Sequence, residues 1–436
     1  MSKKQKNTKK QFISLVIVTI IVAIASTVYF NYNRIVGNTE TQPSMEESAE
    51  MTDAELEIHF IDVGQGDSVF IELPDETCML IDAGNPDGDN TVSNYISGLG
   101  YAQIDYLIVT HGDNDHVGEI PDVLDDFEVK NIYRPFQVAV DSSGNVRDGE
   151  DLAKVYDNAT VKSSVNVISN QAFGKFVQKA YAETYTDGSV VKNAMVSTTY
   201  DGLKIMPKNG NSFAFEFFGP LRNSSNQTLI EQGVASKTQG YASVYQSKPS
   251  YDSLVKNEAS PVMLLEHSSG SYLFTGDATV HAEEAVLGSL SDSEKTRFDA
   301  VDVYHVGHHG ADNSTSDALL EMITPKMAVI SVGAGNSHGH PTAGTLEKLG
   351  DYCSDNIYRS DLHGNILILA NATDIQLKTN NVVVGNLGET EIELPPDEYW
   401  YVYVAGITAA VFVSGVIYIM SNGKIKAKPY KSQKRK

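Results

Sequence analysis

The sequence predicts an α/β fold in which helices cover β-sheets. Short runs alternate apolar with polar residues, as Leu56, Ile58 and Phe60 do in 56–60, and this pattern is typical of half-buried strands. Stretches with helical periodicity follow several of these runs, and such alternation of strands and helices favours a layered α/β architecture. With 41% hydrophobic and 20% charged residues, the composition excludes a mainly disordered chain.

Predicted strands and helices alternate along most of the chain. We expect strands at 56–60, 68–73, 78–81, 104–110, 262–266, 272–275, 301–306 and 327–332. We expect helices at 91–99, 119–127, 279–287, 316–323 and 342–352. Residues 136–260 are rich in Ser, Asn, Lys and Thr, with helices expected only at 152–157 and 171–182. We interpret 136–260 as an insertion-rich part of a domain that spans 55–385.

Two uncharged apolar runs lie outside this domain. Residues 12–30 and 399–420 are each long enough to cross the hydrocarbon core of a bilayer as a helix. Lys-rich tails at 1–11 and 421–436 predict that both ends are cytoplasmic, by the positive-inside rule. The domain would then be extracellular, anchored in the cell membrane by two passes, with linkers at 31–54 and 386–398. Cleavage by signal peptidase after Ala25 is the alternative for the first run.

The distribution of charge argues against a general attraction for nucleic acid. Residues 31–398 contain 21 basic and 56 acidic residues, a net charge of −35. A segment this acidic repels DNA, RNA and anionic lipid. The two cysteines, Cys78 and Cys353, allow at most one disulfide, so the chain has no disulfide framework.

Candidate metal ligands are concentrated at the ends of predicted strands. The segment THGDNDH at 110–116 brings together His111, Asp113, Asp115 and His116, and three later strands lead into FTGDA, HVGHHG and NSHGHP. Seven of the eleven histidines lie in these four segments. Ligands gather at strand ends in layered α/β folds, and imidazole mixed with carboxylate suits Zn, Mn or Fe. The alternative, a helix cap, needs only one such residue.

Taken together, these segments resemble the metallo-β-lactamase fold superfamily, and specifically its ComEC-like branch. The matching motifs follow the family order over about 300 residues: FIDVGQGDS at 60–68, LIDAG at 80–84, THGDNDHVG at 110–118, FTGDA at 274–278, VGHHGADNSTS at 306–316, SVGAGNSHGHP at 331–341 and YRSDLHG at 358–364. The resemblance implies a four-layer αβ/βα sandwich with a metal site between the sheet edges.

The resemblance also implies a role for each motif residue. It implies that one or two divalent ions, Zn or Mn, are bound by His111, Asp113, Asp115, His116, Asp277 and His308. Asp115 is the expected proton carrier, and His340 is the expected contact to the substrate or transition state. Asp82, Asp62 and His309 are expected to orient the ligands from behind.

The sequence departs from the superfamily pattern at two ligand positions. Asp113 stands where most members have a second histidine. No clear histidine replaces the ligand that usually lies between the first motif and Asp277, because His267 falls in a predicted hairpin. We therefore expect one metal subsite to be weak.

Hydrolysis by metal-activated water is the function that the resemblance implies. A bound ion lowers the pKa of water and polarises a P=O or C=O group. The chain's GxSxG pattern, GNSHG at 335–339, lies between the predicted strand 327–332 and the predicted helix 342–352 rather than at a strand-to-helix elbow, and the chain has no P-loop. Both observations favour water over a covalent nucleophile. The expected substrate is a phosphodiester, either a small ester or extracellular DNA. The alternatives are a lactone or thioester hydrolase and a non-catalytic metal-binding surface module, and no obligate protein partner is inferred.

Overall fold

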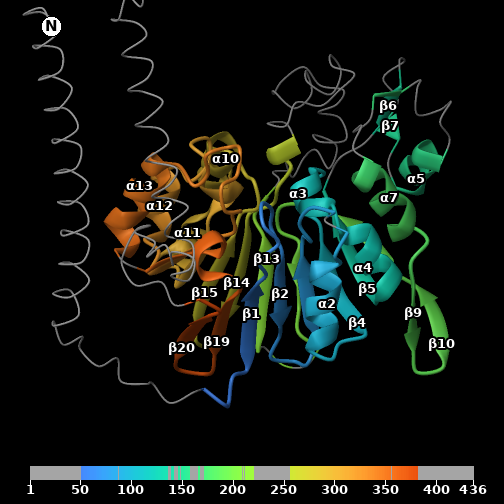
Figure 1. Cartoon of the computed structure of the whole chain (residues 1–436), viewed down its shortest axis with the longest axis horizontal. Coiled ribbons are helices and arrows are strands. Elements are labelled where there is room, and N and C mark those ends of the chain that lie inside the picture. The colour runs from blue at the N-terminus through green and yellow to red at the C-terminus, as the bar shows by residue number, and fades with distance from the viewer. Residues whose placement is uncertain are drawn as a thin grey trace, which may run out of the picture. The chain divides into compact units, whose positions relative to one another are not determined.

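Two mixed β-sheets form the core of the structure (Figure 1). The computed structural model describes residues 51–381, except 87, 136–138, 142–145, 148, 158–164, 167–170, 209, 211, 220–255 and 355.

The first sheet has eight strands in the order β11-β5-β4-β3-β2-β1-β19-β20. Their bounds are β1 Leu56–Phe60, β2 Val69–Glu72, β3 Cys78–Ile81, β4 Gln103–Ile108, β5 Glu128–Arg134, β11 Met195–Thr198, β19 Ile366–Ala370 and β20 Ile375–Thr379. The strands β3, β4, β5 and β11 pair in parallel, and the remaining pairs are antiparallel.

The second sheet has seven strands in the order β12-β13-β14-β15-β16-β17-β18. Their bounds are β12 Lys204–Ile205, β13 Phe213–Phe217, β14 Met263–His267, β15 Gly270–Phe274, β16 Val303–His305, β17 Met327–Ile330 and β18 Ile357–Arg359. The strands from β15 to β18 pair in parallel, whereas β12 to β15 are antiparallel. Each sheet thus has a parallel part whose strand ends meet at one edge.

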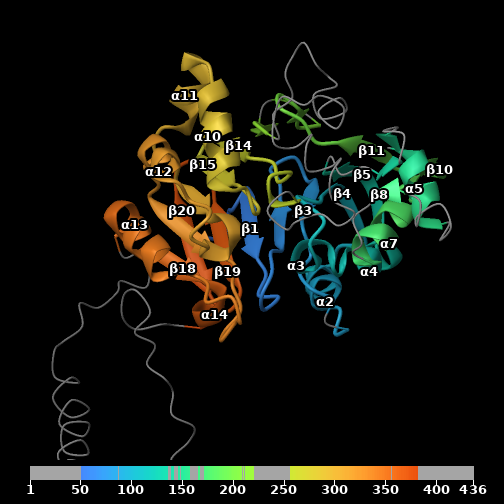
Figure 2. The ribbon, with the colours of Figure 1, turned by 90° about the horizontal axis from the view of Figure 1, so that it is seen from above.

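The two sheets pack face to face, and helices cover their outer faces (Figure 2). Leu56, Ile58 and Phe60 point into the cluster between the sheets, as their alternation predicts. The first sheet is covered by α2 Thr91–Gly98, α3 Asn114–Val117, α4 Ile120–Asp126, α5 Glu150–Asp157 and α7 Gln171–Ala180. The second is covered by α10 Val280–Ser289, α11 Asp292–Phe298, α12 Asp317–Ile323 and α13 Ala343–Cys353. The helix-covered two-sheet α/β architecture is therefore confirmed.

Residues 136–260 contribute strands to both sheets in their described parts. The strand β11 extends the first sheet, and β12 and β13 extend the second. Two smaller sheets lie outside this framework. They are built from β6 Ala139–Asp141, β7 Val146–Arg147 and β8 Val165–Asn166, and from β9 Thr184–Asp187 and β10 Val190–Asn193.

The predicted membrane segments at 12–30 and 399–420, with their tails and the linker at 386–398, lie outside the described residues. Of the helices that the structure does describe, none combines the length and the apolar character of a membrane span. Both cysteines are buried free thiols, Cys78 under the helices of the first sheet and Cys353 under those of the second.

Candidate metal centre

The predicted site residues meet where parallel strands of both sheets end. Asp82 follows β3, the 110–116 loop follows β4, and Asp277 follows β15. His308 and His309 lie in a short turn, η2 Gly307–Gly310, after β16, and the loop carrying His340 follows β17. Because the parallel strands of a sheet all end on one edge, these segments converge although up to 258 residues separate them.

Asp277 lies at the centre of this convergence. Its Oδ1 atom is 3.1 Å from Nε2 of His116 and 3.8 Å from Nε2 of His309. Its Oδ2 atom is 3.6 Å from Nε2 of His111 and 3.5 Å from Nε2 of His308. Each carboxylate oxygen therefore faces its own pair of imidazoles, which is the arrangement that a bridging ligand requires.

On the Oδ2 side of Asp277, a lysine lies beside the predicted ligands His111 and Asp113. Nε2 of His111 is 3.7 Å from Oδ2 of Asp113, and the ammonium of Lys256 forms an ion pair with Asp113. Nδ2 of Asn257 donates a hydrogen bond to Asp277 over 3.3 Å. Sequence analysis missed Lys256 and Asn257 because no motif surrounds them. A fixed positive charge here weakens the attraction of this side for a cation.

On the Oδ1 side, Asp115 and His309 face each other. Oδ2 of Asp115 is 3.3 Å from Nε2 of His309. Nδ1 of His309 donates to the carbonyl of Ser331 over 2.9 Å and lies 3.2 Å from Asp67. Because the Nδ1 proton is engaged, the Nε2 lone pair of His309 is directed toward Asp115 and Asp277. The sequence predicts that His309 orients the metal ligands from behind. This geometry instead favours His309 as a ligand itself.

Asp82 lies behind the 110–116 loop and accepts three hydrogen bonds from it. Its Oδ2 accepts hydrogen bonds from the Thr110 hydroxyl over 2.5 Å and from Nδ1 of His116 over 2.8 Å. The Thr110 amide donates to Oδ1 over 2.8 Å. These bonds keep the proton on Nδ1 of His116, where it is donated to Asp82, and leave Nε2 directed at Asp277.

The described hydrogen bonds of Asp62 join it to Gly64 and Asn365, whereas Asp67 lies beside the candidate ligand His309. The Asp62 carboxylate accepts from the amide of Gly64 over 3.1 Å, so it stabilises its own turn. The Asp67 amide donates to the carbonyl of Asp115 over 3.0 Å. Gly66 permits this approach, because a Cβ there would lie 2.4 Å from the same carbonyl.

The donor set fits a divalent cation. The Nε2 atoms of His111, His116 and His309 and Oδ1 of Asp277 are buried and have no hydrogen-bond partner among the described residues. Buried polar atoms without partners are costly, and a cation between them removes that cost. Three groups of these residues have donor atoms within 4.8 Å of one another: His111, His116 and Asp277; Asp115, His116 and His309; and Asp67, Asp277 and His309. Imidazole with carboxylate is a zinc-type donor set.

The helix-cap alternative for the 110–116 motif finds no support in the described contacts. That alternative has Asp115 or His116 capping the helix that follows. The N-cap residues of α3 and α4 are instead Asp113 and Glu119, and neither side chain makes a capping hydrogen bond to its own helix.

The imidazoles and carboxylates of this cluster shift one another's pKa values. Burial disfavours a charged His116, but Asp277 and Asp82 outweigh it and raise the pKa of His116 well above its ordinary value. Burial likewise disfavours an ionised Asp277, but His116, His309 and His111 hold its pKa well below the usual range. The pKa of His111 is lowered to about 4 by burial and by the charge of His116. The cluster therefore retains ionised carboxylates, which a cation needs.

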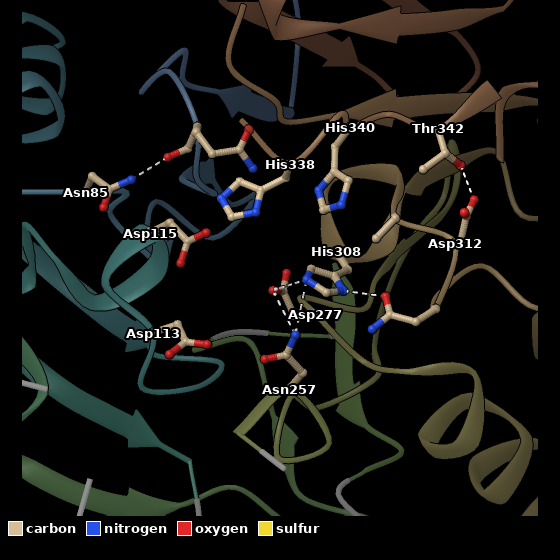
Figure 3. Close-up of a pocket in the computed structure, with 13 residues that line it drawn as sticks. Asn85, Asp113, Asp115, Asn257, Asp277, His308, Asp312, His338, His340 and Thr342 are labelled. Carbon is tan, nitrogen blue, oxygen red and sulfur yellow. Dashed lines mark hydrogen bonds and ion pairs between the residues drawn. The ribbon is translucent and has the colours of Figure 1, made fainter. Parts of the chain in front are cut away.

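A polar cavity of about 630 Å³ opens over the cluster (Figure 3). Asp113, Asp115 and Asp277 line one part of it, and His308 and His340 face them. Burial and the neighbouring His308 lower the pKa of His340 to about 4. The His340 ring is therefore neutral near pH 7, and its Nδ1 has no partner among the described residues.

Comparison with known proteins places this site in a family context. Residues 61–186 match the Metallo-beta-lactamase superfamily, which confirms the resemblance predicted from the motifs. ComE operon protein 3 of Bacillus subtilis is 25% identical over 330 residues, which are 72% of this chain and 33% of that protein. Recombination protein 2 of Haemophilus influenzae is 36% identical over 98 residues, 22% of this chain and 11% of that protein. The chain thus spans a third or less of these relatives.

The chain also aligns with solved structures, at low identity and with low TM-scores. Igni18, a metallo hydrolase from Ignicoccus hospitalis, aligns over 74% of this chain and 98% of its own, with a TM-score of 0.34 and 11% identity. Zn²⁺-bound PqqB from Methylobacterium extorquens aligns over 68% of this chain and 85% of its own, with a TM-score of 0.33 and 10% identity.

Proposed function

Because residues 61–186 match the metallo-beta-lactamase superfamily and a buried His/Asp cluster lies under an open cavity, we propose that this chain is a metal-dependent phosphodiesterase or nuclease. The observation that carries the proposal is the convergence on the two oxygens of Asp277 of three buried Nε2 atoms that have no hydrogen-bond partner among the described residues. One of the relatives reported above is named Recombination protein 2, which supports a DNA-related phosphodiester as substrate.

The proposed metal ligands divide between the two oxygens of Asp277. Asp115, His116 and His309 would hold an ion on the Oδ1 side, because their donor atoms all lie within 4.8 Å of one another. His111 and Asp113 would hold a second, weaker ion on the Oδ2 side, because Lys256 already neutralises Asp113. We assign zinc or manganese to these sites, since both accept imidazole and carboxylate together.

A divalent ion bound here supplies Lewis acidity and lowers the pKa of water. Asp115 lines the cavity with its Oδ2 atom beside His309, so it is placed to accept the proton of the attacking water. His340, neutral near pH 7, donates a hydrogen bond to a substrate oxygen on which charge develops. Asp82 maintains the direction of His116 throughout.

We also propose that the domain is extracellular and anchored in the cell membrane at both ends. The uncharged runs at 12–30 and 399–420 and the Lys-rich tails beyond them support this topology.

The full chain, purified in detergent, tests the activity with bis(p-nitrophenyl) phosphate and single-stranded DNA in Zn²⁺ or Mn²⁺. We expect Asp115→Ala and Asp277→Asn to lower kcat/KM at least about 100-fold, a loss of about 2.7 kcal/mol of transition-state stabilisation. His281→Gln is the matched control, because His281 is an exposed histidine on α10. Chelation should abolish turnover, and added metal should restore it.

The same preparation separates the alternatives. Turnover of lactones or thioesters but not phosphodiesters would identify the other hydrolase class. Bound metal without turnover of phosphodiesters, lactones or thioesters would identify a non-catalytic metal-binding module. Activity that survives in Asp277→Asn would contradict the proposed centre itself.

A further inference from the structure

A second cluster of metal-type donors lies on the outer face of the first sheet, away from the cavity. Glu57 and His59 of β1 lie two residues apart and so share a face, and Glu72 of β2 is directly opposite Glu57. Their donor atoms lie within 4.8 Å of one another. Glu72 pairs with Cys78 at the start of β3, whereas the candidate metal centre begins beyond the end of β3 at Asp82. The two clusters therefore lie at opposite ends of the strands.

His59 is buried with one nitrogen directed at the two carboxylates. Only 3% of its side chain is exposed. Its Nδ1 is 3.0 Å from the hydroxyl of Tyr95, and its Nε2 has no hydrogen-bond partner among the described residues. Nε2 lies 3.3 Å from Oε1 of Glu72 and 3.8 Å from Oε2 of Glu57. When the imidazole proton is on Nδ1 and is donated to the Tyr95 hydroxyl, the Nε2 lone pair faces two carboxylates. A cation between these groups would stabilise them.

The two glutamates are placed to share one cation. Like charges directly opposite each other on neighbouring strands destabilise the pair. Burial and the charge of Glu72 raise the pKa of Glu57, while His59 and Lys378 act in the opposite direction. The Tyr101 hydroxyl donates to Oε2 of Glu72 over 2.6 Å, which leaves Oε1 directed at His59. The side chains of Glu57 and Glu72 are 34% and 29% exposed, so a hydrated ion can reach them.

From this geometry we propose that Glu57, His59 and Glu72 bind a zinc-class divalent cation that ties β1 to β2. One imidazole nitrogen and two carboxylate oxygens form a three-ligand set, with water completing the coordination on the exposed side. The imidazole favours zinc over magnesium. Tyr95 and Tyr101 orient the ligands as hydrogen-bonding partners behind a metal site do. This inference does not depend on the proposed hydrolase function.

Counting zinc on the full chain tests the site. Zinc alone is the probe, and the metal bound after equilibrium dialysis is measured by mass spectrometry. We expect Glu72→Gln and His59→Gln to lose one zinc per chain, or to bind it at least tenfold more weakly, while phosphodiester turnover stays unchanged. Glu72→Gln keeps the shape of the side chain and an acceptor for Tyr101. His281→Gln should bind as much zinc as the wild type.

A second measurement covers the case in which a variant fails to fold. Asp277→Asn, altered only in the candidate metal centre, should retain one zinc that Glu72→Gln then removes. Unchanged zinc counts and affinities in both Glu72→Gln and His59→Gln would overturn the proposal and leave His59 as a protonated partner of the two glutamates. An Asp277→Asn protein without any zinc would overturn it as well.

Discussion

Two adjacent histidines of η2 differ in what their side chains can do. His309 is almost fully buried, its Nδ1 is engaged by Ser331, and its Nε2 faces Asp115. The side chain of His308 is 20% exposed, and its Nδ1 bonds to Asn313 over 2.7 Å while its Nε2 lies 3.5 Å from Asp277. Both residues have positive φ, 50° and 55°, so the tight turn rather than the sequence order determines which ring points inward.

This difference predicts unequal effects of two alanine substitutions. His309→Ala should reduce metal affinity about 100-fold, whereas His308→Ala should reduce it tenfold or less, because a lost ligand costs more than a lost neighbour. Metal per chain after dialysis and kcat/KM on bis(p-nitrophenyl) phosphate measure both. Loss of metal in His308→Ala with retention in His309→Ala would support the sequence-based prediction, in which His308 is the ligand and His309 orients the ligands.

At the scale of elements, an arginine of α11 joins this helix to two strands of the second sheet. Nη2 and Nη1 of Arg297 each lie 2.5 Å from a glutamate, Glu266 on β14 and Glu216 on β13. The guanidinium also lies over the ring of Phe218, 5.1 Å from its centre. Burial opposes the charge of Arg297, but the two glutamates outweigh it and raise the pKa further. The helix has a capping box at Ser291 and Glu294, which determines where it begins.

Replacing this arginine should destabilise the fold without altering the site. We expect Arg297→Leu to lower the free energy of unfolding by about 2 kcal/mol, because the largely buried Glu216 loses its closest partner. The loss is smaller than for a fully buried pair, since Lys204 remains 3.2 Å from Glu216. Urea unfolding followed by circular dichroism measures the change, and the exposed Lys295→Leu should shift it by about 0.5 kcal/mol or less. Equal stabilities of the two variants would refute this role.

At the scale of the whole chain, charge and hydrophobicity are segregated. Residues 31–398 carry a net charge of −35. The tails on the outer sides of the two apolar runs contain basic residues and no acidic residue. Positive flanks remain on the cytoplasmic side during insertion, so an acidic segment between two spans is expected outside. This net charge also limits the nonspecific attraction of the segment for DNA.

Protease added to intact cells tests this topology. We expect the segment between the two apolar runs to be degraded, while epitope tags at both termini stay protected until the cells are permeabilised. A cytoplasmic protein serves as the internal control for cell integrity. Full protection of the central domain, or degradation of either terminal tag in intact cells, would refute the two-pass arrangement.

Local sequence determined the type and order of most elements and the kinds of ligand. Alternation and periodicity act within a few residues, so strands such as 56–60 and helices such as 91–99 were predictable, as were the ligand-rich strand ends. Only the tertiary structure decided that β11 joins one sheet and β13 the other, that His309 faces Asp115, and that Lys256 pairs with Asp113. These contacts join segments far apart in the chain, and the direction of each side chain depends on turns and neighbours that no local pattern records.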